Sequence, residues 1–252
     1  MRTLLTALTL IVLTPTLGLV VILAGLVGAR DRPGGVFDWA PRVWCRAIIR
    51  AAGVRIRLHN ADRMRQDEPR IYVCNHVSWF DIFTLASLLP YYKFVAKAEL
   101  FSIPIFGRAA KSAGMISIER DNRKAAFASY DQAATQIRRG ASVVVFPEGT
   151  RGRSYALRPF KKGPFVLAVS AQAPVVPCVI HGTIHVQPKG SFRIRSGHVD
   201  VHFLEPLATN DMTYEDRDRL ARETWRRMAN ALEREYGIAS ADVERPLATS
   251  AS

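Results

Sequence analysis

The chain changes character near residue 30, from an apolar first part to a longer part in which hydrophobic and polar positions alternate. From Thr3 to Ala29 no residue is charged, and Leu, Val and Ile dominate. A hydrocarbon core about 30 Å thick needs roughly 20 such residues in a helix, so this segment is long enough to cross a bilayer. Pro15 and Gly18 are expected to kink that helix or let it turn back within one leaflet. Spanning and dipping therefore both remain open.

A cleaved signal peptide would also begin with an apolar stretch, and Val27-Gly28-Ala29 is a weak small-residue site. However, only Arg2 precedes the stretch, and the apolar run is long for a signal-peptide core of about 7 to 15 residues. We therefore expect the segment to be retained as a membrane anchor.

A second amphipathic segment follows the apolar one. Pro41 is expected to open a helix on which Arg42, Arg46 and Arg50 recur every fourth residue, opposite an apolar side that includes Trp44. This pattern fits a helix at a membrane surface, and it fits equally a helix packed on the protein's own core. More arginines follow the leader than precede it, which predicts that the body lies at the cytoplasmic face of the inner membrane.

Beyond residue 53, short β-branched runs alternate with helical patterns. Arg123–Arg139 is predicted to be a helix stopped by Gly140, and Asp216–Tyr236 a helix started by a Thr213 capping box. The predicted strands are Val54–Leu58, Ile71–Cys74, Lys93–Ala96, Met115–Ile118, Ser142–Phe146, Val175–Ile180 and Val199–Phe203. This alternation predicts an α/β fold with a mixed, largely buried β-sheet flanked by helices.

Three parts are expected along the chain: anchoring helices in residues 1–53, one globular domain in residues 54–237 and a flexible tail in residues 238–252. The 252 residues are 48% hydrophobic and carry a formal net charge of +13, which excludes a disordered chain. Cys45, Cys74 and Cys178 form no C-x-x-C pair, so neither a disulfide framework nor a cysteine-based zinc site is supported. The histidine pairs lack accompanying Cys or carboxylate ligands, so no metal is expected.

His76 follows directly on the predicted strand Ile71–Cys74, where ligands gather in open α/β sheets. On a straight helix the side chains of His76 and Asp81 would point about 140° apart, so they meet only if the chain turns at Val77 and Ser78. A carboxylate on one imidazole nitrogen would prepare the other nitrogen to take a proton. His76 is thus a candidate general base, and the alternative is a structural histidine beside a solvated Asp81. Ser78 is expected to be a helix N-cap, because the chain has no G-x-S-x-G elbow.

The segment Phe146–Arg151 follows another predicted strand, so it can share a pocket with His76 if the two strands are neighbours. Gly149 would let the backbone approach a ligand, and Arg151 offers a planar fork of donors for phosphate oxygens. Glu148 is better suited to a hydroxyl or to anchoring an arginine than to a phosphate. A turn with a surface ion pair is the alternative.

Two further cations, Lys97 and Arg120, lie at the ends of predicted strands. Such residues are usually solvated, and only their convergence with Arg151 would build a phosphate site.

Four segments resemble, in order and spacing, the four motifs of the glycerolipid acyltransferases, typified by 1-acylglycerol-3-phosphate acyltransferase. They are Asn75-His76 with Asp81, Gly114–Arg120, Phe146–Arg151 and Ala173–Pro177. Lys97-Ala98-Glu99-Leu100 is similar to the lysine-containing segment of that family, and the resemblance runs from about Val54 to Phe203.

The resemblance implies that residues 54–237 are an acyltransferase domain with His76 and Asp81 as its catalytic dyad. The cations and the 149–151 loop would hold the phosphate of the acceptor, Glu148 would assist acceptor binding, and Pro177 would shape the acyl or acceptor pocket. The implied substrate-binding residues are Lys97, Arg120, Glu148, Gly149, Thr150, Arg151 and Pro177. No cofactor or metal is implied.

The implied reaction transfers a fatty acyl group from acyl-CoA or acyl-carrier protein to the sn-2 hydroxyl of 1-acylglycerol-3-phosphate, giving phosphatidic acid. The implied partners are the bilayer, the lysophospholipid and the acyl donor, and no nucleic acid. One alternative acceptor is lyso-ornithine lipid or another lysolipid without a glycerol phosphate. A more distant alternative, supported by charge alone, is a membrane-tethered protein that binds anionic lipid or nucleic acid. Acyl-chain length, the choice of donor and the oligomeric state are not encoded in any motif.

Overall fold

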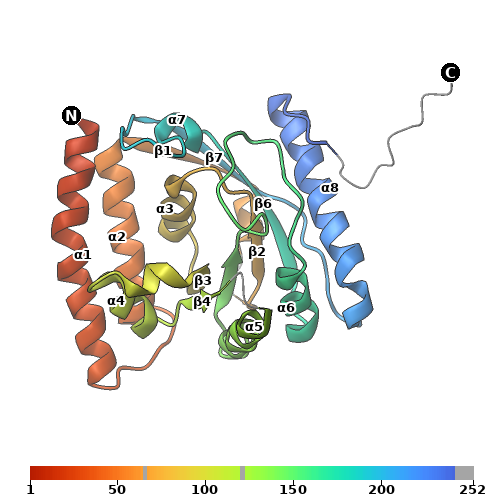
Figure 1. Ribbon diagram of the computed structural model, residues 1–252, viewed down its shortest axis with the longest axis horizontal. Helices are drawn as coiled ribbons and strands as arrows, with labels where there is room; N and C mark the ends of the chain where they lie inside the picture. Colours follow the sequence, from red (N-terminus) through yellow and green to blue (C-terminus); the bar gives the residue numbers. More distant parts are fainter. Residues whose placement is uncertain (65–66, 120–122, 242–252) are drawn as a thin grey trace.

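A single sheet forms the centre of the computed structural model, which describes residues 1–64, 67–119 and 123–241. Within those residues seven strands pair in the order β1-β7-β6-β2-β5-β3-β4 (Figure 1). Neighbours run parallel except β6 and β7, which are antiparallel, so the predicted mixed sheet is confirmed. The strands are β1 (Val54–His59), β2 (Ile71–Cys74), β3 (Tyr92–Lys97), β4 (Ile116–Ile118), β5 (Ser142–Val145), β6 (Val175–His181) and β7 (Gly197–Phe203).

Helices cover both faces of the sheet, as the alternating pattern predicts (Figure 1). The α-helices are α1 (Arg2–Leu26), α2 (Val36–Ala52), α3 (Trp79–Leu88), α4 (Phe106–Ser112), α5 (Arg123–Arg138), α6 (Gly163–Ala171), α7 (Thr183–Val186) and α8 (Arg217–Tyr236). Short 3-10 turns are η1 (Ala61–Arg63), η2 (Ala98–Ser102) and η3 (Tyr214–Asp216). The predicted capping box of Thr213 and Asp216 is confirmed, but η3 intervenes before α8 begins.

The two faces of the sheet are sorted by the alternation of side chains along each strand. Val73 and Val145 pack with α5, α6 and α8 in one core cluster. Their neighbours Cys74 and Val144 point to the opposite face, where they pack with α2 and α3 in a second cluster. Because both faces are buried, β2 and residues 143–145 of β5 are runs of consecutive apolar residues.

The apolar helix α1 is continuous from Arg2 to Leu26 with Pro15 inside it, so the chain does not turn back at Pro15 and Gly18. A proline inside a helix removes one backbone hydrogen bond, and α1 packs against α2 and α4. Gly18 serves a close approach instead: a Cβ there would lie 2.8 Å from Ile105 Cγ2. The glycine therefore lets α1 pack directly against the start of α4.

Both ends of α1 are held by the globular body. Near its start, Thr3 Oγ1 accepts a hydrogen bond from the backbone N–H of Ile194 at 3.0 Å. Beyond its end, Asp31 forms an ion pair with the fully buried Lys93 at 2.8 Å. Burial lowers the pKa of Lys93, and Asp31 opposes that shift. The helix consequently lies along one side of the body, at the left in Figure 1.

The second helix does not begin at Pro41 as expected but at Val36, with Pro41 inside it. Asp38 explains the earlier start, because its carboxylate accepts the backbone N–H of Gly34 at 2.7 Å and lies in the first turn, where a negative charge is favoured. The inner face of α2, including Cys45 and Ile48, joins the core cluster shared with β2 and α3. The inner face of α2 therefore packs on the protein's own core, and contact of its outer face with a membrane surface stays a prediction.

Candidate active site

The turn after β2 brings His76 and Asp81 together. Ser78 caps α3, as expected, and helix α3 starts one residue later, so the chain turns between the two side chains. His76 Nδ1 lies 2.9 Å from Asp81 Oδ2. Because a carboxylate accepts hydrogen bonds, Nδ1 carries the proton and Nε2 keeps its lone pair. The imidazole therefore has the tautomer that a general base requires.

Asp81 is fully buried, and hydrogen bonds compensate for the burial of its charge. Oδ2 also accepts the backbone N–H groups of Val77 at 2.7 Å and Ser78 at 2.8 Å. Oδ1 accepts the hydroxyl of Thr183, at the start of α7, at 2.6 Å. These bonds fix the carboxylate in position, so the carboxylate in turn fixes the imidazole ring.

The 146–152 loop lies beside the His76 turn because β5 pairs with β2, with Val145 opposite Val73. Glu148 Oε1 accepts the backbone N–H of His76 at 2.9 Å, and the carbonyl of His76 accepts the N–H of Gly152 at 2.7 Å. The imidazole ring stacks on Phe146 with 4.0 Å between ring centroids. The two strands are therefore neighbours, which is the condition that the sequence set for a shared pocket.

Glu148 is buried beside the His76 turn. Its second oxygen, Oε2, accepts the Nε–H of Arg158 at 3.1 Å, so the glutamate anchors an arginine, one of the two uses that its type suggested. Burial raises the pKa of Glu148, while the hydrogen bonds from His76 and Arg158 oppose the rise. Both carboxylate oxygens are engaged within the protein, between the loop and the His76 backbone.

An apolar cavity of about 610 Å³ opens beside His76. We call it the apolar cavity. Its walls come from α1, α2, α3, β3 and α4, and include Leu13, Leu17, Trp44 and Phe83. At the His76 end the lining turns polar. The polar or charged residues at that end are His76, Lys97, Thr150 and Arg151.

The predicted cations differ in how they approach this cavity. The Arg151 guanidinium lies over the Trp79 ring, 4.6 Å from its centroid, and burial lowers the pKa of this arginine. Lys97 is exposed and forms an ion pair with Glu99 at the cavity mouth. Arg120 lies outside the described residues, so its convergence with the other two remains an expectation.

The backbone of the loop has the freedom that the sequence suggested. Gly149 has a positive φ of 76°, and a Cβ there would lie 3.0 Å from Lys161 Cε. The Thr150 carbonyl accepts a hydrogen bond from Arg158. Glycine at position 149 therefore permits both the turn and the close approach of Lys161.

The structure does not place Pro177 at the cavity. It lies in β6 opposite Val73 and therefore faces α5, α6 and α8, whereas the apolar cavity is on the other face of the sheet. It lines neither of the two cavities described for this chain. Side chains alternate between the two faces along a strand, and this alternation turns Pro177 away from the apolar cavity. Its position therefore does not match the expected role in shaping that pocket.

Sequence reasoning missed two residues of the site, Thr183 and Arg158. Thr183 lies two residues beyond the end of β6, so the rule that placed His76 at a strand end would also have found it. Arg158 lies ten residues beyond Glu148 in irregular chain, and no local pattern marks it. Among the residues that the structure describes, no cluster of three or more His, Cys, Asp or Glu could hold a metal ion.

Known proteins with similar sequences indicate the family to which the chain belongs. The chain is 40% identical over 138 residues to the 1-acyl-sn-glycerol-3-phosphate acyltransferase BAT2, chloroplastic, of Brassica napus, covering 55% of this chain and 40% of that protein. It is 35% identical over 173 residues to the 1-acyl-sn-glycerol-3-phosphate acyltransferase of Limnanthes douglasii, covering 68% and 61%. The chain thus spans less than two thirds of the length of either relative.

The fold is also shared with a solved structure. The crystal structure of the 1-acyl-sn-glycerophosphate (LPA) acyltransferase PlsC from Thermotoga maritima matches with a TM-score of 0.78 and 22% identity, covering 95% of this chain and 97% of that one. Residues 55–181, which hold the His76 turn and the 146–152 loop, match the sequence profile of the family described as Acyltransferase. By that match this chain is a member of the acyltransferase family.

Proposed function

We propose that this protein transfers a fatty acyl group from acyl-CoA or acyl-carrier protein to the sn-2 hydroxyl of 1-acylglycerol-3-phosphate, giving phosphatidic acid. His76 Nε2 takes the proton of the acceptor hydroxyl as its oxygen attacks the thioester carbonyl carbon. The carbon–sulfur bond then breaks, and the proton passes from His76 to the departing thiolate. General-base help of this kind contributes about 10² to 10⁴ in rate.

One observation carries this proposal: an imidazole whose Nδ1 is held by a buried carboxylate stands at the polar end of an apolar cavity. The volume of about 610 Å³ is in the range of small-molecule sites. Its apolar walls suit the fatty acyl chain, and the polar end suits the thioester and the attacking hydroxyl. The names of the relatives support the same acceptor.

The acceptor's phosphate would be held at the cavity mouth. Arg151 offers a planar guanidinium fork, Thr150 precedes it in the lining, and Lys97 adds an exposed ammonium. Gly149, with its positive φ, turns the loop toward these residues. We assign Arg120 to the same group from the sequence alone. A lysolipid without a glycerol phosphate, such as lyso-ornithine lipid, is the second candidate acceptor. The same acyl donor would serve either acceptor, so the apolar cavity does not distinguish between them.

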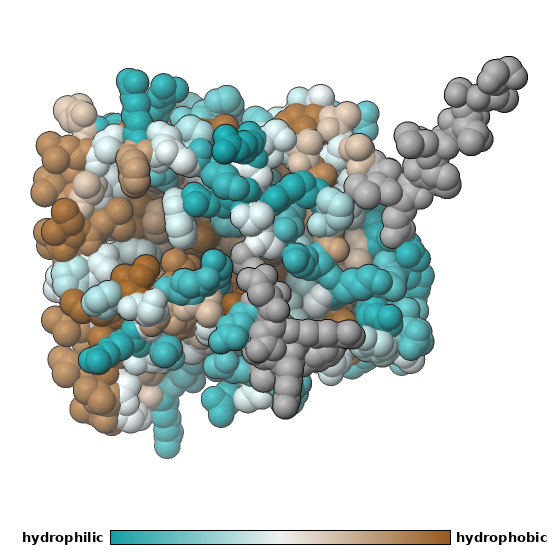
Figure 2. Space-filling model, in the orientation of Figure 1, coloured by the Kyte–Doolittle hydropathy of each residue, from teal (hydrophilic) through white to brown (hydrophobic). Residues whose placement is uncertain are grey.

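Membrane association follows from α1 and its neighbours. Large apolar side chains on the outer side of α1 are about half exposed or more, namely Leu8, Ile11 and Leu23. On α2, Trp39 and Val43 are nearly half exposed. Figure 2 shows apolar side chains along the side of the molecule formed by α1. A large exposed apolar surface marks an interaction site, and because both ends of α1 are tied to the body, we propose that the helix lies in the membrane plane. The cytoplasmic face of the inner membrane is the expected location.

The test is acyl transfer by the purified, detergent-solubilised chain to lysophosphatidate and to lyso-ornithine lipid, with acyl-CoA and with acyl-carrier protein. We expect turnover of lysophosphatidate and a loss of at least 100-fold in His76→Ala, with lipid binding retained. Equal rates on the acceptor without phosphate would remove the case for the phosphate cations. If the wild type shows no turnover but binds lipid or nucleic acid, and His76→Ala binds equally well, the binding-protein alternative is favoured.

A further inference from the structure

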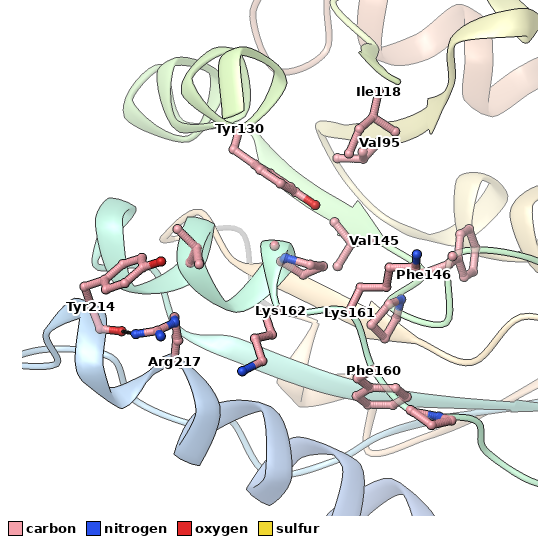
Figure 3. Close-up of a pocket in the computed structure, with 16 residues that line it drawn as sticks. Val95, Ile118, Tyr130, Val145, Phe146, Phe160, Lys161, Lys162, Tyr214 and Arg217 are labelled. Carbon is pink, nitrogen blue, oxygen red and sulfur yellow. Dashed lines mark hydrogen bonds between the residues drawn. The ribbon is translucent and has the colours of Figure 1, made fainter. Parts of the chain in front are cut away.

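The chain leaves the 146–152 loop through residues 152–157, a segment to which the proposed reaction assigns no role. At its start the N–H of Gly152 donates to the carbonyl of His76 at 2.7 Å. Three residues later the side chain of Tyr155 is buried. Tyr155 lines neither cavity, and the chain reaches the second cavity, of about 800 Å³, further along, at Phe160 and Lys161 (Figure 3). The hydroxyl of Tyr155 therefore serves a contact within the protein.

That contact is with the turn at residues 182–184, which joins β6 to α7. The phenol oxygen of Tyr155 accepts the backbone N–H of Ile184 at 3.0 Å. Burial raises the pKa of Tyr155, and hydrogen bonding from this turn opposes the rise. An N–H in the first turn of a helix has no partner within the helix. Tyr155 thus satisfies a donor that α7 itself leaves open.

The 182–184 turn is also held from the side of β7. Gly182 has a positive φ of 99°, and a Cβ there would lie 2.1 Å from the carbonyl oxygen of His198, so only glycine lets the chain pass so closely. The ring of Tyr155 packs on His181 with 4.5 Å between centroids. His181 in turn stacks on Tyr236 of α8 at 3.7 Å. The turn is consequently fixed between β7 and a tyrosine that α8 supports.

Thr183 connects this turn to the catalytic dyad. Its hydroxyl is buried and donates to Asp81 Oδ1 at 2.6 Å. The other oxygen of that carboxylate lies 2.9 Å from His76 Nδ1. A hydroxyl has a single proton to donate, so its direction depends on where the turn holds Thr183. A displacement of the turn would therefore reach the imidazole through the carboxylate.

We propose that Tyr155 is a positioning residue for the acyl transfer. Its hydroxyl holds the 182–184 turn so that Thr183 donates to Asp81, and the carboxylate then holds the imidazole of His76. The segment that carries Tyr155 also bonds the backbone of His76, so it joins both members of the dyad. This inference rests on the proposed function and adds to it a residue outside the four motif segments.

Initial rates of acyl transfer by Tyr155→Phe test the proposal, because this change removes the hydroxyl and keeps the ring against His181. We expect kcat to fall about tenfold with both KM values unchanged, since a 1 Å misplacement of a reacting group can cost about 100-fold in rate. Tyr72→Phe is the matched control: Tyr72 is buried in β2, and within the described residues its hydroxyl has no hydrogen-bond partner. Circular dichroism melts check that each variant is folded. A kcat unchanged in Tyr155→Phe, or a loss confined to KM, would overturn the proposal.

Variants of Thr183 show whether Tyr155 acts through this residue. Thr183→Ser keeps the hydroxyl, and Thr183→Val removes it. In the Thr183→Ser background, Tyr155→Phe should still lower kcat about tenfold. In the Thr183→Val background it should lower kcat less than about twofold, because the group that it positions is gone. Equal losses in the two backgrounds would mean that the side chains act independently, and the proposal would fail.

The Nδ1–H proton of His76 gives a second readout, which needs no turnover. A hydrogen bond to a carboxylate shifts such a proton downfield, and in protein labelled with ¹⁵N-histidine its resonance is identified by its loss in His76→Ala. We expect Tyr155→Phe to move this resonance upfield or to broaden it, and Tyr72→Phe to leave it unchanged. A resonance that is the same in Tyr155→Phe as in the wild type would contradict the positioning role.

The two readouts separate this inference from the proposed function. If the wild type does not acylate lysophosphatidate but the His76 resonance responds to Tyr155→Phe, the proposed function fails and the positioning role stands. If the wild type acylates lysophosphatidate and Tyr155→Phe changes neither kcat nor the resonance, the positioning role fails and the proposed function stands.

Discussion

At the ends of β2 and β5 hydrogen bonds fix the position of His76, whereas the apolar cavity beside it is bounded mainly by side chains that only pack. Asp81 accepts hydrogen bonds on both oxygens, and Glu148 holds the backbone of His76. The cavity walls, by contrast, come from four helices and a strand, with residues such as Leu17 and Phe83. Hydrogen bonds impose direction, and packing imposes only volume. Changes at the strand ends should therefore act on rate, and changes at the walls on which lipid is accepted.

Replacing Asp81 with Asn should give the largest effect. The amide preserves size but can donate to the imidazole, which favours the wrong tautomer, so kcat should fall by about 10² to 10⁴. Initial rates of acyl transfer, measured with purified protein and one fixed acyl donor, give the change in kcat. Asp131→Asn on the exposed face of α5 is the control. If Asp81→Asn retains activity within a few fold of the wild type, the dyad has no role in catalysis.

Replacing exposed apolar residues of α1, the helix that forms one wall of the cavity, should give the next largest effect, on membrane binding. Leu8→Glu together with Ile11→Glu removes two exposed apolar side chains from α1. Inserting such a side chain is worth about 1.5 to 3 kcal/mol, so binding to phospholipid vesicles should weaken at least about 100-fold. Flotation with vesicles measures it, and Gln132→Glu with Asn230→Glu is the charge-matched control at exposed positions. Equal flotation of both variants would argue against α1 as the membrane contact.

Glu148→Gln should have an intermediate effect on rate. The amide can still accept the N–H of His76, but it loses the ion pair with Arg158. A lost charge-assisted hydrogen bond costs about 1.5 kcal/mol, so we expect kcat to fall about tenfold with KM nearly constant. A change confined to KM would instead indicate that Glu148 contacts the acceptor.

The same variant has a defined pH signature. Because burial raises the pKa of Glu148, the folded protein keeps this proton to a higher pH than the unfolded chain does. Stability is therefore lost as the pH rises from about 4.5, the ordinary value, through the raised folded-state pKa. The free energy of unfolding of the wild type should fall relative to that of Glu148→Gln over this interval in urea titrations. Parallel pH profiles would contradict the raised pKa.

The smallest effect is expected from filling the apolar cavity. Ala110→Leu adds bulk from α4 to the cavity lining without touching the hydrogen-bonded strand ends. Each methylene of the acyl chain that no longer fits loses about 0.8 kcal/mol, or roughly a fourfold loss in kcat/KM. Donors of increasing chain length should show a shifted preference toward shorter chains. Ala221→Leu on α8 is the control, and an unshifted preference would mean that the chain lies elsewhere.

Much of the His76 site is encoded locally. The turn at Val77 and Ser78, the N-cap and the contact of His76 with Asp81 involve residues close in sequence, so spacing and capping chemistry predict them. The neighbouring position of the 146–152 loop also follows from strand-end reasoning. What spacing did not indicate is that Thr183, 102 positions from Asp81, completes the carboxylate's hydrogen bonds.

By itself the sequence determined the alternation of strands and helices, the buried central strands and the two strand-end segments, because these depend on side-chain periodicity and short-range hydrogen bonds. Only the tertiary structure decided that α1 stays unbroken and lies along the body, that Pro177 faces away from the cavity, and that Arg158 and Lys161 approach the loop. These features depend on which surfaces meet. Such contacts form between residues far apart in the chain, and no local pattern specifies them.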